Sequence, residues 1–323
     1  MRNHQYGLSL IELMIGMAIG IILVGGSFYV YASTRAAFDT NESYALMQEN
    51  ARYAFTLLEP DIQLAGLWGN HSNPDAIVGR AADRDAGDVL FAGDCAANWT
   101  VDFNQYLGGT NDVASPLSCF PDGRYLLGTD VLISRRAATT PVRDADLAVG
   151  QVYLRSSEFP LSEVFIAAGA DPTTSIPTGL PQRAENFPVI ARMYYISKYT
   201  VASGDDSDGI PSLRRVELQT SGGAPDIIDS EVIPGVANMQ VQFGIDSNGD
   251  EAVDAYVHAD NPLLRNDNVK AVRIWLLMRA QNPELGYEDD LVYRMGGRNI
   301  SVPDAFNDHR HLAVSRTIFL RNR

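Results

Sequence analysis

A run of twenty residues without a formal charge, from Leu13 to Ala32, constrains this chain more than any other feature of its sequence. At a rise of 1.5 Å per residue, a helix of that length covers the bilayer's hydrocarbon core, which is about 30 Å thick. The sequence therefore predicts one membrane-spanning helix, at about residues 10–32. Only Arg2 and His4 can carry positive charge ahead of it, which favours a cytoplasmic amino terminus and an exported remainder.

Glu12 stands at the leading edge of this apolar run. A cleaved secretory signal has an apolar stretch of only about 7 to 15 residues with a small-residue cleavage site after it, and this segment differs from that pattern. A carboxylate in the middle of a bilayer costs about 2.5 to 3.5 kcal/mol, and less near the interface, so Glu12 needs a partner or a role. Two interpretations are open: an interfacial side chain that reaches the head groups, or a docking charge for another molecule.

Composition excludes several classes of protein. With 323 residues, of which 46% are hydrophobic and 20% charged, the chain is too apolar for disorder and long enough to bury a core. Its net charge of −15 argues against nucleic acid as a partner, because gripping phosphates takes clustered Lys and Arg. The sequence has no Gly-x-Ser-x-Gly, His-Glu-x-x-His or P-loop pattern, so we do not expect an enzyme.

Helical spacing continues beyond Arg35, which predicts that the membrane helix extends into an amphipathic half that packs on a globular head. Pro60 removes one backbone donor, so we expect a kink or an end near Leu58, and Gly66 and Gly69 then close the segment. The apolar residues of this half recur every three or four positions: Tyr44, Met47, Ala51, Ala54, Phe55, Leu58, Ile62 and Ala65.

Beyond Gly69 the pattern is one of short β-prone runs separated by Gly, Pro, Asp and Ser clusters. The fold class predicted is therefore α+β, with a long amino-terminal helix packed on a mainly antiparallel β head. The predicted strands are 130–135, 151–155, 189–199, 213–219, 239–245, 269–279 and 312–321.

The residues around Glu12 carry a resemblance. Gly7-Leu8-Ser9-Leu10-Ile11-Glu12 resembles the class III leader of type IV prepilins and type II secretion pseudopilins, with Leu8 where Phe is usual. The resemblance implies a leader peptide of residues 1–7, cleavage after Gly7 by the prepilin peptidase, and N-methylation of the new amino terminus at Leu8. It also implies that Glu12 pairs with the terminal amine of a neighbouring subunit, an attraction that is several-fold stronger at low dielectric than in water.

Two further runs narrow the resemblance to the PilW family of minor pilins. They are Asn50-Ala-Arg-Tyr-Ala54 and Asp61-Ile-Gln-Leu-Ala-Gly66, with Gln63 where that family commonly has Arg and Asn70 where it commonly has Cys. The runs at 269–279 and 312–321 also resemble the closing strands of that family. The resemblance implies a pilin helix over residues 8–66 and a periplasmic or extracellular head over 67–323, in which an inserted subdomain at about 70–130 is left open.

The chain has two cysteines, Cys95 and Cys119, which cannot form a four-ligand structural zinc site by themselves. In a periplasmic head, where thiols are oxidised, we favour a disulfide between them over two unrelated buried thiols.

One acidic loop has part of the spacing of a calcium site. Oxygen-bearing side chains occupy positions 1, 3, 5 and 9 of an EF-hand-like loop. Glu251 replaces the usual glycine and Val257 replaces the last acid, and a polar hairpin turn explains the same residues equally well. No cofactor is certain, and calcium stays open. The candidate ligands are Asp246, Asn248, Asp250 and Asp254.

The resemblance implies a function in pilus assembly. Such a minor pilin joins other minor pilins in a tip complex, primes polymerisation of the major pilin, and links the fibre to a tip adhesin in support of adhesion or twitching motility. Before assembly it is a single-pass protein of the inner membrane with a periplasmic head, and afterwards it lies at the pilus tip on the cell surface.

Two alternatives remain open. A minor pseudopilin of type II secretion has the same leader, and only the two PilW-like runs speak against it. A signal-anchored periplasmic hydrolase or calcium-binding receptor is an alternative of another class, for which Gly7 and Glu12 would be dispensable.

Overall fold

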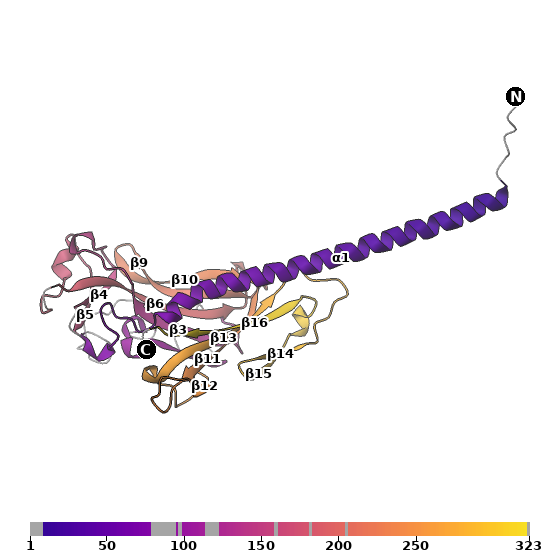
Figure 1. Ribbon diagram of the computed structural model, residues 1–323. Helices are drawn as coiled ribbons and strands as arrows, with labels where there is room; N and C mark the ends of the chain where they lie inside the picture. The colour runs from indigo at the N-terminus through magenta and orange to yellow at the C-terminus, as the bar shows by residue number, and fades with distance from the viewer. Residues whose placement is uncertain are drawn as a thin grey trace, which may run out of the picture. The chain divides into compact units, whose positions relative to one another are not determined.

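The structure is a computed structural model that describes residues 9–78, 95, 99–113, 123–157, 161–180, 183–203 and 206–321. It consists of one long helix followed by short helical turns and β-strands that are mostly antiparallel (Figure 1). The predicted α+β class is confirmed. The chain divides into an amino-terminal unit that ends at Leu46 and a head unit that begins at Met47.

Helix α1 runs from Leu10 to Gln63. Of the kink or end expected near Leu58, an end is wrong, because the helix continues through Pro60. A proline so close to the end of a helix removes one hydrogen bond, and the carbonyl of Pro60 still accepts the Leu64 N–H at 3.1 Å. The predicted apolar face is confirmed within the head unit, where these residues of α1 and the turn after it are buried: Met47, Ala51, Ala54, Phe55, Leu58, Ile62 and Ala65.

The chain leaves α1 through two glycines with positive φ, Gly66 at 75° and Gly69 at 70°. The N–H of Gly66 donates to the carbonyl of Arg135 at 3.0 Å, which ties the helix end to a strand. At Gly69 a Cβ atom would lie 2.7 Å from both Cδ2 of Phe187 and Cβ of Ser156. Only glycine fits the conformation and the space at this position.

The larger sheet has the strand order β1-β5-β4-β6-β3-β2, with β9 paired to β6 and β10 paired to β9. β6 is its central strand, because it pairs with β3, β4 and β9. Every pairing is antiparallel except that of β1 with β5. The strands are β1 (Ile77–Val78), β2 (Leu107–Thr110), β3 (Val131–Ala137), β4 (Val152–Ser156), β5 (Ser162–Ile166), β6 (Glu185–Ser197), β9 (Ser212–Ser221) and β10 (Ala224–Pro234).

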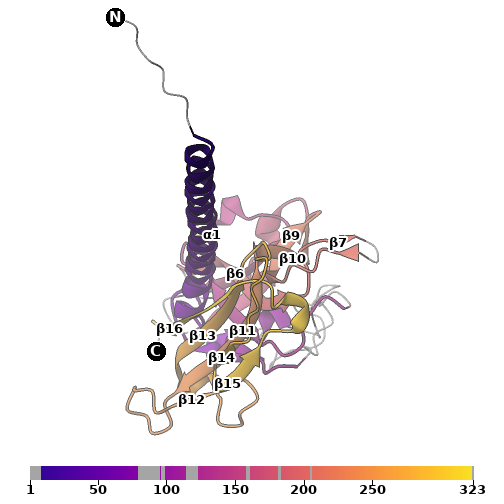
Figure 2. The ribbon, with the colours of Figure 1, turned by 90° about the vertical axis from the view of Figure 1, so that its right-hand side faces the viewer.

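The smaller sheet has the order β12-β11-β13-β16, so that β12 and β16 form its edges (Figure 2). Its strands are β11 (Val236–Ile245), β12 (Ala255–Val257), β13 (Val269–Arg279) and β16 (His311–Phe319). Two short hairpins, β7 (Ala202–Ser203) with β8 (Asp206–Ser207) and β14 (Val292–Met295) with β15 (Arg298–Ser301), complete the described strands.

The strand predictions succeed where hydrophobic residues alternate or cluster. All seven predicted runs overlap strands, and the alternate residues of β13 (Val272, Ile274, Leu276 and Met278) are fully buried as expected. The prediction missed β10, whose sequence contains Pro225, Asp226 and Asp229 and resembles a loop. β10 forms because it pairs along β9 as an edge strand, where proline and charged residues are tolerated.

The described part of residues 70–130 includes β1 and β2, both of which pair within the larger sheet. The remainder of this region lies outside the described residues, so an inserted subdomain there stays a prediction.

Asp130, directly before β3, joins the two sheets. Its N–H donates to the carbonyl of Met239 at 2.8 Å, and its Oδ2 accepts the N–H of Val241 on β11 at 2.7 Å. Its Oδ1 accepts the N–H of Asp112 at 2.9 Å. Burial raises the pKa of Asp130 to about 6, although these two N–H donors lower it.

We expect Gly69→Ala to destabilise the head by about 2 to 4 kcal/mol, because the added Cβ is both strained and obstructed. The measurement is urea unfolding of the full chain in detergent. Gly169→Ala is the matched control, because Gly169 also has a positive φ, of 81°, but a Cβ there meets no atom within 4 Å. Equal losses in the two variants would show that close packing at Gly69 contributes nothing.

The raised pKa of Asp130 predicts a pH-dependent stability. The Asp130 carboxyl group binds a proton more tightly in the folded state than in the unfolded chain. The contribution of Asp130 to the free energy of unfolding therefore falls as pH rises from about 4 to about 6. The total fall is up to about 3 kcal/mol. Urea unfolding at several pH values should show a flatter curve for Asp130→Asn than for the wild type. Parallel curves would contradict the assignment of this titration to Asp130.

Candidate functional site

Helix α1 starts with a capping box formed by Ser9 and Glu12. The Ser9 N–H donates to Glu12 Oε2 at 2.9 Å, and the Glu12 N–H donates to Ser9 Oγ at 3.3 Å. Glu12 is exposed. The predicted processing residues Gly7 and Leu8 lie outside the described residues. The spacing Ser-x-x-Glu is a known signature of helix starts, and the sequence analysis overlooked it.

The first half of α1 is a surface of exposed apolar side chains. None of its most apolar 18-residue window is buried, and by length and composition α1 can span a membrane. Ile11, Ile21 and Phe28, for example, are 66%, 74% and 72% exposed. An apolar surface of this size needs lipid or other protein to cover it.

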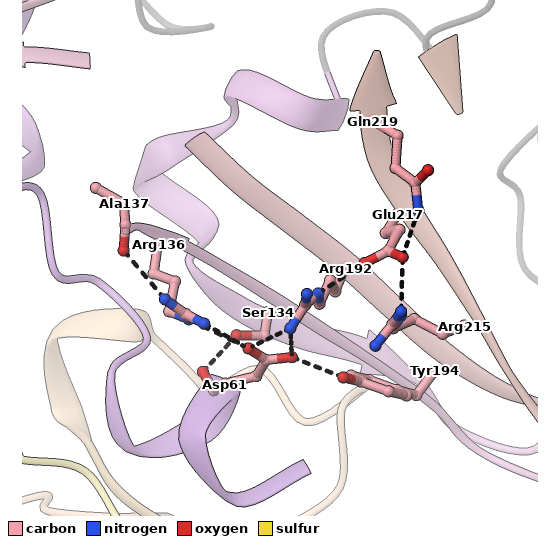
Figure 3. Close-up of polar contacts among 9 residues, drawn as sticks. All are labelled: Asp61, Ser134, Arg136, Ala137, Arg192, Tyr194, Arg215, Glu217 and Gln219. Atoms are coloured by element: carbon pink, nitrogen blue, oxygen red, sulfur yellow. Dashed lines mark hydrogen bonds and ion pairs between the residues drawn. The ribbon is translucent and has the colours of Figure 1, made fainter. Parts of the chain in front are cut away.

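The last turns of α1 carry a buried carboxylate, Asp61, which is 1% exposed. Figure 3 shows its side chain among Arg136 of β3 and Arg192 and Tyr194 of β6. Oδ1 accepts from Nε and Nη2 of Arg136 at 3.1 and 3.0 Å. Nη1 of Arg192 donates to both carboxylate oxygens at 3.0 Å, and the hydroxyl of Tyr194 donates to Oδ2 at 2.6 Å. We call these four residues the helix-end anchor.

A second carboxylate extends the anchor across the sheet. Glu217 on β9 accepts from Nε of Arg192 at 2.9 Å and from Nη2 of Arg215 at 2.6 Å (Figure 3). Burial lowers the pKa of the Arg192 guanidinium. The negative charges of Asp61 and Glu217 have the larger combined effect, so the pKa is raised. Burial, and then the charge of Asp61, raises the pKa of the Tyr194 phenol. The guanidinium of Arg192 therefore stays charged and the phenol of Tyr194 stays neutral.

The helix-end anchor holds the end of α1 on the larger sheet. The hydroxyl of Ser134 also donates to the backbone carbonyl of Asp61 at 2.6 Å. All donors come from β3 and β6, which are adjacent antiparallel strands, so the same sheet register that aligns those strands brings the donors together. This arrangement binds and orients the end of the helix.

The two residues at which the chain departs from the common PilW pattern have partners here. The side-chain amide of Gln63 donates to Glu59 Oε1 at 2.9 Å, and its backbone carbonyl accepts the Arg321 N–H at 2.9 Å. The N–H of Asn70 donates to Ser156 Oγ at 3.1 Å.

Cys95 is fully buried and disulfide-bonded. The other cysteine of the predicted pair, Cys119, lies outside the described residues, and the pairing stays a prediction.

The candidate calcium loop forms a network of hydrogen bonds within itself. Asp246 Oδ1 accepts the N–H groups of Asn248 and Gly249 at 3.1 and 2.6 Å, and its Oδ2 accepts that of Glu251 at 2.9 Å. The hydrogen bond from the Gly249 N–H, together with those from the N–H groups of Glu251 and Asn248, lowers the pKa of Asp246. Asp250 and Asp254 also accept hydrogen bonds within the loop, from the N–H groups of Ala252 and Ser247. Among the described residues no group of three His, Cys, Asp or Glu is placed to hold a metal ion, and calcium binding stays a prediction.

Comparison with known families identifies two parts of the chain. Residues 2–28 match the prokaryotic N-terminal methylation motif. Residues 193–322, about two fifths of the chain, match the family described as type IV pilus-assembly protein W, PilW. Together the two matches are those of a PilW-like type IV minor pilin. No curated protein and no solved structure matches it.

The PilW match begins at Met193, within β6, and includes β9 to β16. Residues 48–69, on which part of the resemblance was based, lie outside both matched ranges. The PilW family is a structural component of pilus assembly rather than a class of enzymes.

We expect Asp61→Asn to lower the free energy of unfolding by about 3 to 5 kcal/mol, because it leaves the buried guanidinium of Arg136 and the half-buried one of Arg192 short of a counter-charge. Urea unfolding of the full chain in detergent, followed by the fluorescence of buried Trp68, measures this loss. Glu59→Gln is the matched control. Glu59 lies on the same helix, two residues before Asp61, and forms an exposed ion pair with Arg316 of β16. Loss of that ion pair should cost at most about 1 kcal/mol. A loss for Asp61→Asn as small as that of the control would argue against the anchor.

Proposed function

We propose that this minor pilin joins a complex of minor pilins at the pilus tip, where it primes assembly of the type IV pilus and supports adhesion or twitching motility. Its proposed partners are the prepilin peptidase, other minor pilins, the major pilin and a tip adhesin. It resides in the inner membrane with a periplasmic head before assembly, and at the tip of the fibre afterwards.

The observation that carries this proposal is the exposed carboxylate of Glu12 in the first turn of an exposed apolar helix. Among the residues that the structure describes, the Glu12 carboxylate accepts from a neutral backbone N–H, that of Ser9. A protonated amine at Leu8 of a neighbouring subunit is a stronger donor, because both partners then carry charge. Exchange of the first bond for the second would link subunits and set their register.

The helix-end anchor supports the mechanical part of the proposal. A subunit held in a fibre by its helix must pass load from that helix to its head. Asp61 on α1 and Arg192 on β6 are joined by two hydrogen bonds of 3.0 Å, so this connection resists displacement along the helix axis better than apolar contacts alone.

We also propose that the loop from Asp246 to Asp254 binds calcium, but the role in pilus assembly does not depend on it. The loop supplies carboxylate and amide oxygens, the ligand type that calcium prefers. A signal-anchored hydrolase or calcium-binding receptor could contain the same loop, but its function would not require Glu12.

Three substitutions separate processing from assembly. We expect Gly7→Val to leave the leader attached, and Glu12→Gln to be processed but poorly incorporated into pili, because it keeps an acceptor for Ser9 and loses the charge. Ser9→Ala is the matched control that removes the cap and keeps the charge, and it should be incorporated. Mass spectrometry of the cellular protein and quantification in sheared pili measure both steps. Normal incorporation of Glu12→Gln would refute the docking role.

Crosslinking in intact cells decides between the pilus and type II secretion. Recovery of other minor pilins, the major pilin and an adhesin supports the proposed function. Recovery of secretion components instead would favour the pseudopilin alternative.

A further inference from the structure

A cavity of about 450 Å³ opens in the head unit between the smaller sheet and the segment that follows β15. Its volume is within the range of small-molecule sites. β13 and β16 contribute to its lining, as do the turn before β3 and the short helix Asp304–Phe306. The walls are mainly apolar, formed by Leu126, Leu127, Leu277, Ile300, Val302 and Phe306.

A buried cation, Arg279, also lines this cavity and is only 5% exposed. Its Nη1 donates to the carbonyl of Gly209 at 3.2 Å, and its guanidinium carbon lies 5.0 Å from the ring centroid of Phe306. Its Nε is buried and has no hydrogen-bond partner among the residues that the structure describes. Within the same set, no carboxylate lies within ion-pair distance of it.

The acidic residues around Arg279 already have partners. Asp208 and Asp308 act on it only from a distance, and they bind Thr200 and His309. Asp289 accepts from Nδ1 of the neighbouring His311 at 2.9 Å and from the hydroxyl of Tyr293 at 2.8 Å. Burial lowers the pKa of Arg279, but a guanidinium stays protonated in any protein.

The position of Arg279 contrasts with that of the anchor arginines. Arg136 is buried and Arg192 is half-buried, and each lies beside a carboxylate of the chain, as a charge removed from water requires. Arg279 is more fully buried, at the wall of an apolar cavity, with a carbonyl and an aromatic ring as its described partners. Lys198 adds a second cation to the same lining.

We propose that this cavity binds a small organic carboxylate with an apolar body. The carboxylate would pair with Arg279, whose planar fork suits its two oxygens, and the apolar body would lie against Leu126, Ile300 and Phe306. A dianion such as a phosphate ester suits the site less well, because apolar walls penalise the second charge. This inference is independent of the role in pilus assembly.

Isothermal titration of the full chain in detergent tests the proposal, with 3-phenylpropanoate as the probe and its neutral amide as the comparison. We expect saturable binding of the acid and affinity about tenfold or more weaker for the amide. Because the chain carries a net charge of −15, general attraction cannot account for binding of an anion. Absence of saturation up to about 10 mM acid, or equal binding of acid and amide, would overturn the proposal.

Two variants locate the site. Arg279→Gln should weaken binding of the acid about tenfold or more, whereas Arg316→Gln, which alters an exposed arginine on β16 outside the cavity, should not. Ile300→Trp should block the cavity while the Arg279 side chain is retained, which keeps the test valid where Arg279→Gln does not fold. Unchanged binding in Ile300→Trp, or an equal loss in Arg316→Gln, would place the acid elsewhere.

Discussion

The shared carboxylate of Asp61 is the interaction on which the rest of the head depends. Apolar contacts along α1 are not directional, so by themselves they allow the helix to rotate or slide. Two guanidinium groups and a phenol bind Asp61 from adjacent strands, and they accept one arrangement of the helix end. Desolvation offsets much of the attraction in such a cluster, so we infer that its main effect is to specify position. The positive φ of Gly66 then turns the chain just beyond the end of α1 at Gln63.

Buried charge is used in two ways in this head. At the helix-end anchor, two guanidinium groups of the chain neutralise the buried carboxylate of Asp61. At Arg279 the guanidinium has a carbonyl and an aromatic ring as its described partners, beside an apolar cavity. The physical cost of burying charge is the same in both places. The difference is that Asp61 supplies the counter-charge at one site, whereas the proposed ligand supplies it at the other.

In the proposed function, one side chain of the amino-terminal segment would combine a local task with an intermolecular one. Glu12 completes the capping box with Ser9, which stabilises the first turn of α1 in a single subunit. The same carboxylate is exposed and free to meet a stronger donor. Because the internal bond is to a neutral N–H, its exchange for a charged amine favours association. Under this proposal, the start of α1 is stable in a single subunit and becomes more stable when it meets a neighbouring subunit.

Features encoded by neighbouring residues were predictable from the sequence. The apolar run from Leu13 to Ala32, the leader ahead of it and the alternation along β13 depend on local spacing, and the structure and the family matches agree with them. The strand order, β10 and the partners of Asp61 were not predictable. They depend on residues about 75 and 130 positions apart, which approach one another only when the sheet forms. Local periodicity reports which face of an element is apolar, but only the tertiary structure decides which buried charges meet and which, like Arg279, are left at a cavity.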